Sequence, residues 1–199
     1  MKLVLASKNP HKLREMQTIL SQLGLEVVLE SDVGVDVDVE ETGTTFAENA
    51  MLKARAVMEQ SGMAAIADDS GLMVDALDGA PGVYSARYGH LDSDQARTAY
   101  LLKNLEDVPA EKRSARFVSA IACVLPDGRT VTAQGTCEGE ILFAPRGENG
   151  FGYDPVFYVP ALGKTFAEAA PDEKNAVSHR GRALAAFEAA WKEKGYAHE

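Results

Sequence analysis

A short basic segment near the N-terminus could bind an anionic ligand. It consists of Ser7, Lys8, Asn9, Pro10, His11 and Lys12. Asn9 suits the N-cap of a helix and Pro10 its first position. A lysine in the first turn of a helix is unfavourable unless an anion is shared there, because the N-terminus is partially positive. Backbone amides and two lysines would then form a phosphate cradle; the alternative is that both lysines extend from a surface loop into solvent.

Paired carboxylates form a second candidate, and their chemistry suits a metal ion. Glu40 and Glu41 follow one strand-like run, and Asp68 and Asp69 follow another. Side chains at strand ends of α/β proteins converge on a crevice. Neighbours on extended backbone point to opposite sides, so one member of each pair should face the crevice and the other should support it. Carboxylate oxygens together with a phosphate suit Mg²⁺; the alternative for Asp68 and Asp69 is a turn or a helix cap.

Three further segments carry side chains that could contact a ligand. Lys53 lies one helical turn after Asn49 and on the same face, although alone it would be a surface lysine. A Gly-rich segment offers aromatic rings that can stack on a ligand or fill the core. A third segment sets a hydroxyl, an imidazole and a guanidinium side by side, without the elbow motif or third member of a serine hydrolase. The residues of the last two segments are Phe151, Gly152, Tyr153, Asp154, Lys174, Ser178, His179 and Arg180.

Alternating strand-like and helical patterns must position these side chains. Strands are predicted over residues 3–6, 33–39, 64–67, 117–125, 130–134 and 156–159. Valine at every second position predicts the strand 33–39, and the turn residues 126–128 predict a hairpin of the two strands beside them. The pattern indicates one α/β unit, and the absence of a linker favours a single domain over residues 1–199.

Capping residues predict where the helices begin and end. The first predicted helix has its apolar face over residues 13–23 and stops at Gly24. The second opens with Thr45 and Glu48 as a capping box, runs through residue 58 and stops at Gly62. A third is predicted near residues 93–105. The last carries Leu184, Phe187 and Trp191 at core spacing and stops at Gly195.

Composition excludes several classes of protein. The 199 residues include 20 Lys and Arg against 30 Asp and Glu, a formal charge of −10, and 46% of them are hydrophobic. This acidic balance argues against a protein that coats nucleic acid. No run approaches the ~18 apolar residues of a membrane span, and the N-terminus lacks the apolar region of a secretory signal. Only Cys123 and Cys137 are present, which fits reduced thiols and a place in the cytosol.

Together and in this order, the motifs resemble those of the inosine/xanthosine triphosphate pyrophosphatases. The resemblance covers residues 2 to about 190, with no departure at the positions that define the family. Its motifs are Ser7-x-Asn9-x-x-Lys12; Glu40-Glu41-Thr42-Gly43-x-Thr45-Phe46-x-Glu48-Asn49-Ala50-x-x-Lys53-Ala54; Ala67-Asp68-Asp69-Ser70-Gly71-Leu72; Gly79-x-Pro81-Gly82-x-Tyr84-Ser85-Ala86-Arg87; Phe151-Gly152-Tyr153-Asp154-Pro155; and Lys174-x-x-x-Ser178-His179-Arg180.

The resemblance implies an Mg²⁺-dependent enzyme that hydrolyses ITP, dITP and XTP to the monophosphate and diphosphate. It implies an elongated mixed α/β fold with two lobes around a central cleft, and a homodimer. Residues 7–12 and Lys53 would contact the phosphates. Glu40 or Glu41 would hold the metal together with Asp68 and Asp69, and Asp69 would also be the general base. Ser70, residues 151–154, Lys174, His179 and Arg180 would bind the rest of the nucleotide.

Elementary chemistry agrees with these roles. Attack of water on the α-phosphorus develops negative charge that Mg²⁺ and lysines can neutralise, while a carboxylate deprotonates the water. Donors from His179 and Arg180 would favour a 6-oxo purine over adenine; the sequence does not show how GTP is rejected. Two alternatives remain at this stage: a nucleotide sensor without turnover, and a related hydrolase of pyrimidine or modified nucleotides.

Overall fold

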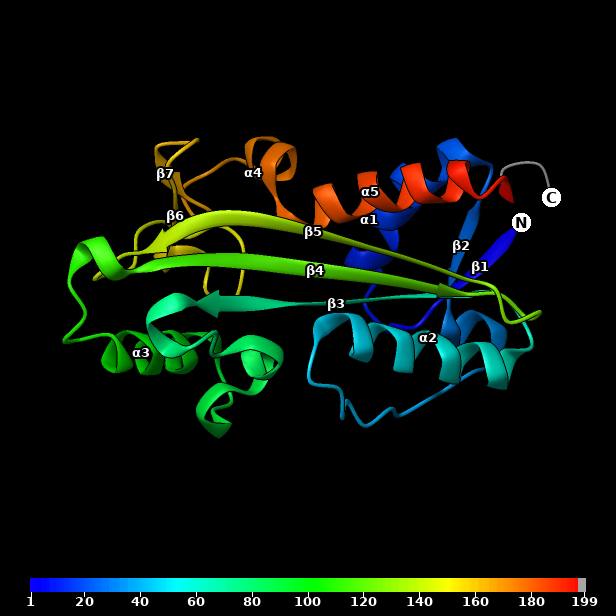
Figure 1. Cartoon of the computed structure of the whole chain (residues 1–199), viewed down its shortest axis with the longest axis horizontal. Coiled ribbons are helices and arrows are strands. Elements are labelled where there is room, and N and C mark those ends of the chain that lie inside the picture. The colour runs from blue at the N-terminus through cyan, green and yellow to red at the C-terminus, as the bar shows by residue number, and fades with distance from the viewer. Residues whose placement is uncertain (197–199) are drawn as a thin grey trace. The chain divides into compact units, whose positions relative to one another are not determined.

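The computed structural model describes residues 1–196. Its central element is a mixed seven-stranded sheet. The strand order is β2-β1-β3-β4-β5-β6-β7 (Figure 1). β1 pairs parallel with β2 and with β3, whereas β6 pairs antiparallel with β5 and β7. The strands are β1 (Lys2–Leu5), β2 (Glu26–Leu29), β3 (Ala65–Val74), β4 (Ser114–Val124), β5 (Thr130–Ile141), β6 (Phe157–Val159) and β7 (Lys164–Thr165). The predicted α/β class is confirmed.

Five α-helices accompany the sheet in the described part of the chain. They are α1 (Pro10–Leu20), α2 (Phe46–Ser61), α3 (Asp94–Asn104), α4 (Pro171–Val177) and α5 (His179–Glu193). All three predicted helix ends marked by glycine are confirmed, because Gly24, Gly62 and Gly195 adopt positive φ just after a helix or its last 3₁₀ turn. None of the helices in residues 1–196 is long and apolar enough to cross a membrane.

The chain divides into two compact units. The first contains Met1–Asp69, Ser119–Gly135 and the chain from Arg182 onward; the second contains Ser70–Val118 and Thr136–Gly181. In the first unit, α1 and the residues of α5 cover one face of the strands and α2 covers the other (Figure 1). Its main core packs Met16 and Leu20 of α1 against Phe187 and Trp191 of α5. Burial of these side chains holds both helices on the sheet.

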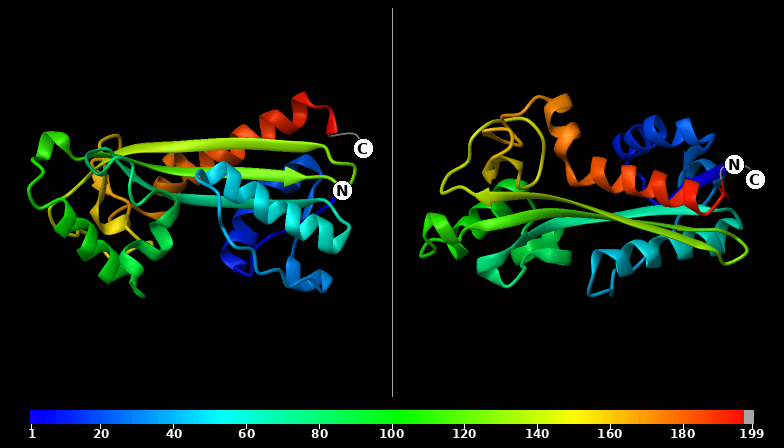
Figure 2. Two further views of the ribbon diagram at one scale, coloured as in Figure 1. Left: turned by 60° about the horizontal axis from the view of Figure 1, so that its bottom comes forward. Right: turned by 45° about the horizontal axis from the view of Figure 1, so that its top comes forward.

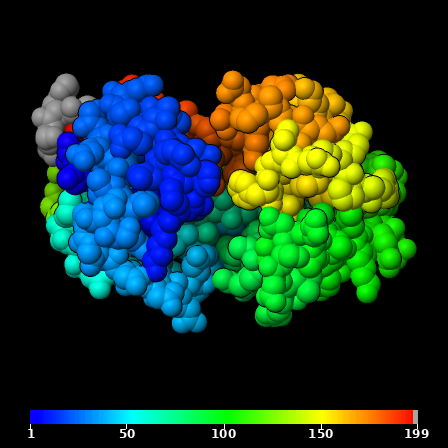
Figure 3. Space-filling view, turned by 180° about the vertical axis from the view of Figure 1, so that it is seen from behind, coloured from blue at the N-terminus to red at the C-terminus, as the bar shows by residue number. Residues whose placement is uncertain are grey.

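The second unit has its own core and contains a long Gly-rich loop. This core includes Leu101 of α3, Phe117 of β4, and Phe157 and Phe166 around β6 and β7. Within this unit the loop, yellow in Figure 3, lies directly against the green chain that includes α3.

The β4–β5 hairpin is confirmed and is longer than predicted. The two views of Figure 2 show its strands running in opposite directions. Its turn is closed by the Gly128 amide, which donates to the Leu125 carbonyl, and by the Arg129 amide, which donates to the Asp127 side chain.

The predicted strand over residues 33–39 is wrong, since none of these residues pairs with a strand in residues 1–196. The valine alternation nevertheless has a structural cause. Val35 is buried, and Val33 and Val37 pack beside it on a cluster that includes Val57 of α2. The segment has no regular secondary structure, and its valines are buried on one side by packing. It lacks the hydrogen-bonded neighbour that a strand requires.

Four other elements differ from the sequence prediction. β3 was expected to end at residue 67, but it continues through the two aspartates to Val74. The sequence Asp68-Asp69-Ser70-Gly71 therefore lies inside a strand and forms no turn. β2, β7 and α4 were not predicted, because each has at most seven residues and shows no clear periodicity.

Candidate functional site

The N-terminus of α1 is built as the sequence predicted. The Asn9 side chain accepts a hydrogen bond from the His11 amide at 2.9 Å, and Pro10 occupies the first turn. The Ser7 hydroxyl accepts from the Asn9 amide at 3.1 Å. This network fixes the turn between β1 and α1 and presents the helix N-terminus next to two lysines.

The lysines of this segment contact carboxylates. Lys8 forms an ion pair with Asp36, and both side chains are exposed. The Lys12 ammonium donates to Asp68 Oδ1 at 2.9 Å, and that aspartate side chain is almost fully buried. His11, in contrast, is exposed and lies beside Arg14. Lys12 thus extends toward the aspartates of β3, while the His11 ring turns to its own helix.

The Lys53 ammonium lies between two carboxylates of the first unit, those of Glu41 and Asp69. Its Nζ donates to the Asp68 carbonyl at 2.8 Å and to Asp69 Oδ1 at 3.3 Å. The same Nζ lies 3.6 Å from Glu41 Oε1. The side chains of Asp68 and Asp69 contact different lysines, because side chains alternate along a strand. Lys53 therefore joins α2, β3 and the loop before α2 at one point.

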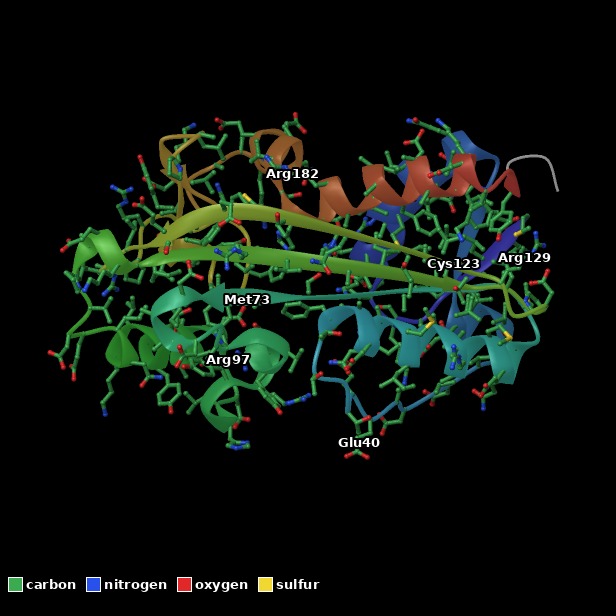
Figure 4. All side chains as sticks on the ribbon, in the orientation of Figure 1. Glu40, Met73, Arg97, Cys123, Arg129 and Arg182 are labelled. Carbon is green, nitrogen blue, oxygen red and sulfur yellow. The ribbon has the colours of Figure 1, made fainter. Side chains whose placement is uncertain are left out.

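The loop before α2 distinguishes the two adjacent glutamates. Glu41 is partly buried and faces Lys53, whereas Glu40 is exposed and points away from the molecule (Figure 4). The loop is held by the Gly43 amide, which donates to the Asn49 side chain at 2.7 Å. A Cβ at position 43 would come within 2.6 Å of Asn49 Oδ1 and 2.7 Å of the Glu48 Cβ. Only glycine allows this close approach.

Asp69 has the electrostatic environment of a proton acceptor. Burial raises its pKa; the Lys53 ammonium opposes that rise and the charge of Glu41 adds to it. Its Oδ2 is buried and forms no hydrogen bond of normal geometry within residues 1–196, although the Asn49 side chain is close enough to lower the pKa. Raised carboxyl pKa values at buried sites with a charged partner are a common feature of catalytic groups.

These carboxylates also fit a metal that is shared with a ligand. Among residues 1–196, no three His, Cys, Asp or Glu side chains form a closed metal site. Mg²⁺ in nucleotide sites, however, uses one or two carboxylates, with phosphate oxygens and waters for the rest. Asp69 Oδ2 and the adjacent Glu41 supply that number of oxygens.

A pocket in the second unit collects the other predicted ligand-binding residues. Its volume is about 180 Å³. The predicted residues that line it are Ser70, Phe151, Gly152, Tyr153, Asp154, Lys174, His179 and Arg180. Segments more than a hundred residues apart in sequence thus meet in one hollow, with cationic and aromatic groups in its wall.

An ion pair supports the aromatic wall of this pocket. Lys174 Nζ donates to Asp154 Oδ2 at 2.7 Å, and that oxygen also accepts from the Phe151 amide at 3.1 Å. The Phe151 ring is 64% exposed, and Lys174 Nζ lies 4.9 Å from its centre. Burial raises the pKa of Asp154 and Lys174 opposes the rise. Phe151 is free on its outer face to stack on a planar ligand.

The other aromatic and polar residues have different roles. Tyr153 is buried, and its hydroxyl donates to the Ser85 carbonyl at 2.6 Å, so it anchors the wall from inside. The His179 ring stacks on Phe117 with 4.9 Å between ring centres. The Ser178 hydroxyl accepts from the Gly181 amide and caps α5. His179 and Arg180 are thereby fixed in the first turn of α5.

Sequence reasoning missed Asp94, Arg97 and Ser85, which line the same pocket. Asp94 and Arg97 lie in the first turns of α3, where a sequence shows only a well-capped helix. The signal that could have found Ser85 is the Tyr84-Ser85-Ala86-Arg87 run, which is part of one of the motifs that carry the resemblance.

Comparisons with known proteins show which proteins this chain is similar to. The model of the Ham1 family matches residues 3–190. A dITP/XTP pyrophosphatase of Geobacillus kaustophilus is 52% identical over 192 residues, covering 96% of this chain and 94% of the relative. The structure of the Staphylococcus aureus Ham1 protein is 42% identical with a TM-score of 0.90 and covers 98% of this chain and all of its own. A HAM1 protein from Coxiella burnetii is 46% identical with a TM-score of 0.91, covering 97% and 99%.

Proposed function

Because this chain belongs to the Ham1 family, we propose that it hydrolyses deaminated purine nucleoside triphosphates, namely ITP, dITP and XTP. The products are the nucleoside monophosphate and diphosphate. The observation that carries the proposal is the Lys53 cluster, in which one ammonium orients a buried carboxylate of raised pKa whose second oxygen forms no hydrogen bond of normal geometry in residues 1–196. Such a carboxylate can take a proton from water.

The residues of the first unit supply the hydrolytic chemistry. The Asp69 carboxylate accepts the proton of the attacking water, while Lys53 holds Oδ1 and keeps the carboxylate in one orientation. Lys12 and the amides at the N-terminus of α1 attract the phosphates and neutralise charge that develops on their oxygens. No nucleophilic side chain is needed, since water attacks the α-phosphorus directly.

Asp69 and Glu41 would hold Mg²⁺ together with the phosphates. When bound, the ion would supply Lewis-acid stabilisation of the phosphoryl oxygens. Lys53 contacts both carboxylates and so keeps their mutual repulsion low before the ion arrives. We assign the metal role to Glu41 and not to Glu40, because only Glu41 faces this cluster.

The pocket of the second unit would receive the purine base. Phe151 offers a stacking face that does not discriminate bases, and His179 and Arg180 offer donors that match a 6-oxo group. His179→Ala or Arg180→Ala should therefore lower the ratio of kcat/KM for ITP to that for ATP by about tenfold, since each donor is worth ~1.4 kcal/mol of discrimination. If steady-state assays show an unchanged ratio, residues other than His179 and Arg180 discriminate between the bases.

Diphosphate release from a panel of ITP, XTP, dITP, GTP, ATP and dUTP tests the proposal, with Mg²⁺ and with a chelator. Metal-dependent release of diphosphate from the deaminated purines, about a hundredfold above GTP and ATP, corresponds to ~2.7 kcal/mol of differential transition-state binding and is the expected result. Release of orthophosphate would move the attack to the γ-phosphorus. Tight binding of ITP without release would make the protein a sensor, and preference for dUTP would make it a pyrimidine hydrolase.

The resemblance also leads us to propose a homodimer in the cytoplasm, where nucleoside triphosphates are made and used. Light scattering coupled to size exclusion measures the molecular mass in solution. A mass of one 21.3 kDa chain at the concentration of the assay would contradict the dimer.

A further inference from the structure

The aromatic wall of the base pocket has little packing to hold it. Gly150 and Gly152 flank Phe151 with positive φ values of 73° and 60°. A second hollow, of about 720 Å³, lies on the other side of this loop. Phe151, Gly152 and Asp94 line both hollows. A largely exposed ring between two glycines and two hollows cannot be fixed by close packing, so its position must depend on hydrogen bonds.

Two carboxylates hold the two amides that flank the Phe151 Cα. Asp154 Oδ2 accepts from the Phe151 amide at 3.1 Å, and Asp94 Oδ2 accepts from the Gly152 amide at 2.9 Å. Each carboxylate has its own cation, because Lys174 contacts Asp154 at 2.7 Å and Arg97 contacts Asp94 at 2.7 Å. The Thr98 hydroxyl adds a longer contact of 3.4 Å to the Gly152 carbonyl. The backbone at Phe151 is therefore clamped from α3 as well as from its own loop.

We propose that Asp94 is a positioning residue for base binding, which holds the Gly152 amide and thereby fixes the Phe151 ring at the edge of the pocket. The inference rests on the proposed function for its choice of ligand. The Gly152 amide and Arg97 lower the pKa of Asp94, so its carboxylate is ionised and a strong acceptor at neutral pH. Arg97, which Figure 4 labels, belongs to α3 like Asp94 and donates to the Asp94 carboxylate.

A residue that acts through Phe151 has a specific kinetic signature. It affects the binding of every purine base to the same extent, because stacking does not distinguish them, and it leaves the chemistry at the α-phosphorus unchanged. Asp94→Ala should therefore raise KM for ITP about fivefold with little change in kcat, and should leave the ratio of ITP to GTP hydrolysis unchanged. Asp94→Asn keeps an oxygen acceptor for the Gly152 amide and should stay within about twofold of the wild type.

Two further variants separate positioning from helix stability. Ser93→Ala removes the N-cap of α3, whose hydroxyl accepts from the Ala96 amide at 3.0 Å, without touching the loop. It should weaken the helix by about 1 kcal/mol and leave KM unchanged. In a Phe151→Ala background, Asp94→Ala should have no further effect on KM, since the group through which it acts is gone.

The test measures kcat and KM for ITP and GTP across these variants, and hydrogen exchange at the amides of residues 151 and 152 without nucleotide. Faster exchange in Asp94→Ala but not in Ser93→Ala, together with the rise in KM and its loss in the Phe151→Ala background, is the expected result. Unchanged exchange in Asp94→Ala, or a further rise in KM when Asp94→Ala is added to Phe151→Ala, contradicts the proposed role of Asp94. A wild-type protein that fails to hydrolyse ITP contradicts the proposed function instead. The exchange rates, which are measured without nucleotide, then still show whether Asp94 holds the Gly152 amide.

Discussion

Asp69 combines the properties of a general base in one side chain. It is largely buried, its pKa is raised, and Lys53 fixes one of its oxygens. Asp69→Asn keeps the size and one oxygen but cannot accept the proton, so kcat should fall by about 10³-fold while ITP binding changes little. Stopped assays and calorimetric titration with ITP measure the two quantities. Turnover near the wild-type rate would remove Asp69 from the mechanism.

Glu40 and Glu41 form a matched pair of substitutions, since they are adjacent and chemically identical. Only Glu41 lies by Lys53. Glu41→Gln should raise the Mg²⁺ concentration for half-maximal activity about tenfold, because a neutral amide is a weaker ligand for a hard cation. Glu40→Gln should leave it unchanged. Activity measured over a range of Mg²⁺ compares the two, and equal shifts would contradict the assignment.

The same pair shows where prediction from the sequence stops at this scale. Residue types and spacing singled out both glutamates and both aspartates as candidates. The choice between Glu40 and Glu41 needed the actual path of the loop, because that loop is irregular and has no fixed alternation of side chains.

At the scale of the elements, the junction between α2 and the loop before it leads to a further prediction. A Cβ at Gly43 would collide with Asn49 and Glu48, so Gly43→Ala should displace the loop that carries Glu41. The Mg²⁺ requirement should then rise as it does in Glu41→Gln, by up to about tenfold. Thr44→Ala is the control: it removes only the 3.1 Å contact of the hydroxyl with Glu48. An Mg²⁺ requirement that rises equally in both variants would rule out the steric cause.

Helices were predicted better than strands, for physical reasons. Asn9 and Thr45 each cap a helix at the predicted position, since a cap depends on a few adjacent residues. The helix predicted near residues 93–105 begins after a cap at Ser93. A strand depends on a partner that is distant in sequence. The valines near residue 35 therefore mimicked a strand without pairing, and the aspartates of β3 suggested a turn although their strand continues.

For the molecule as a whole, the Lys174–Asp154 ion pair predicts how stability depends on pH. Burial raises the pKa of Asp154, and Lys174→Met removes the charge that opposes this rise. A carboxyl group whose pKa is higher in the folded chain gives stability that is present below its unfolded pKa and lost as pH rises through the folded pKa. The variant should lose about 3 kcal/mol at pH 7 and much less near pH ~4.

Urea unfolding of the Lys174→Met variant at several pH values measures this dependence. Asp154→Asn combined with Lys174→Met is the control, because it has no buried carboxyl to titrate and should show no extra slope. An equal loss of stability at both pH values would mean that Lys174 acts by packing alone.

The division of the chain into two units has one more consequence. The boundaries fall between residues 69 and 70, 118 and 119, 135 and 136, and 181 and 182, and these lie inside β3, β4, β5 and α5. Domain boundaries usually lie in exposed linkers, where a gene can be cut and rejoined without damage. Here every exchange of one unit for a foreign one would sever hydrogen-bonded secondary structure at four places. A recombination that replaced either unit would therefore have to cut and rejoin three strands and one helix without losing their hydrogen bonds.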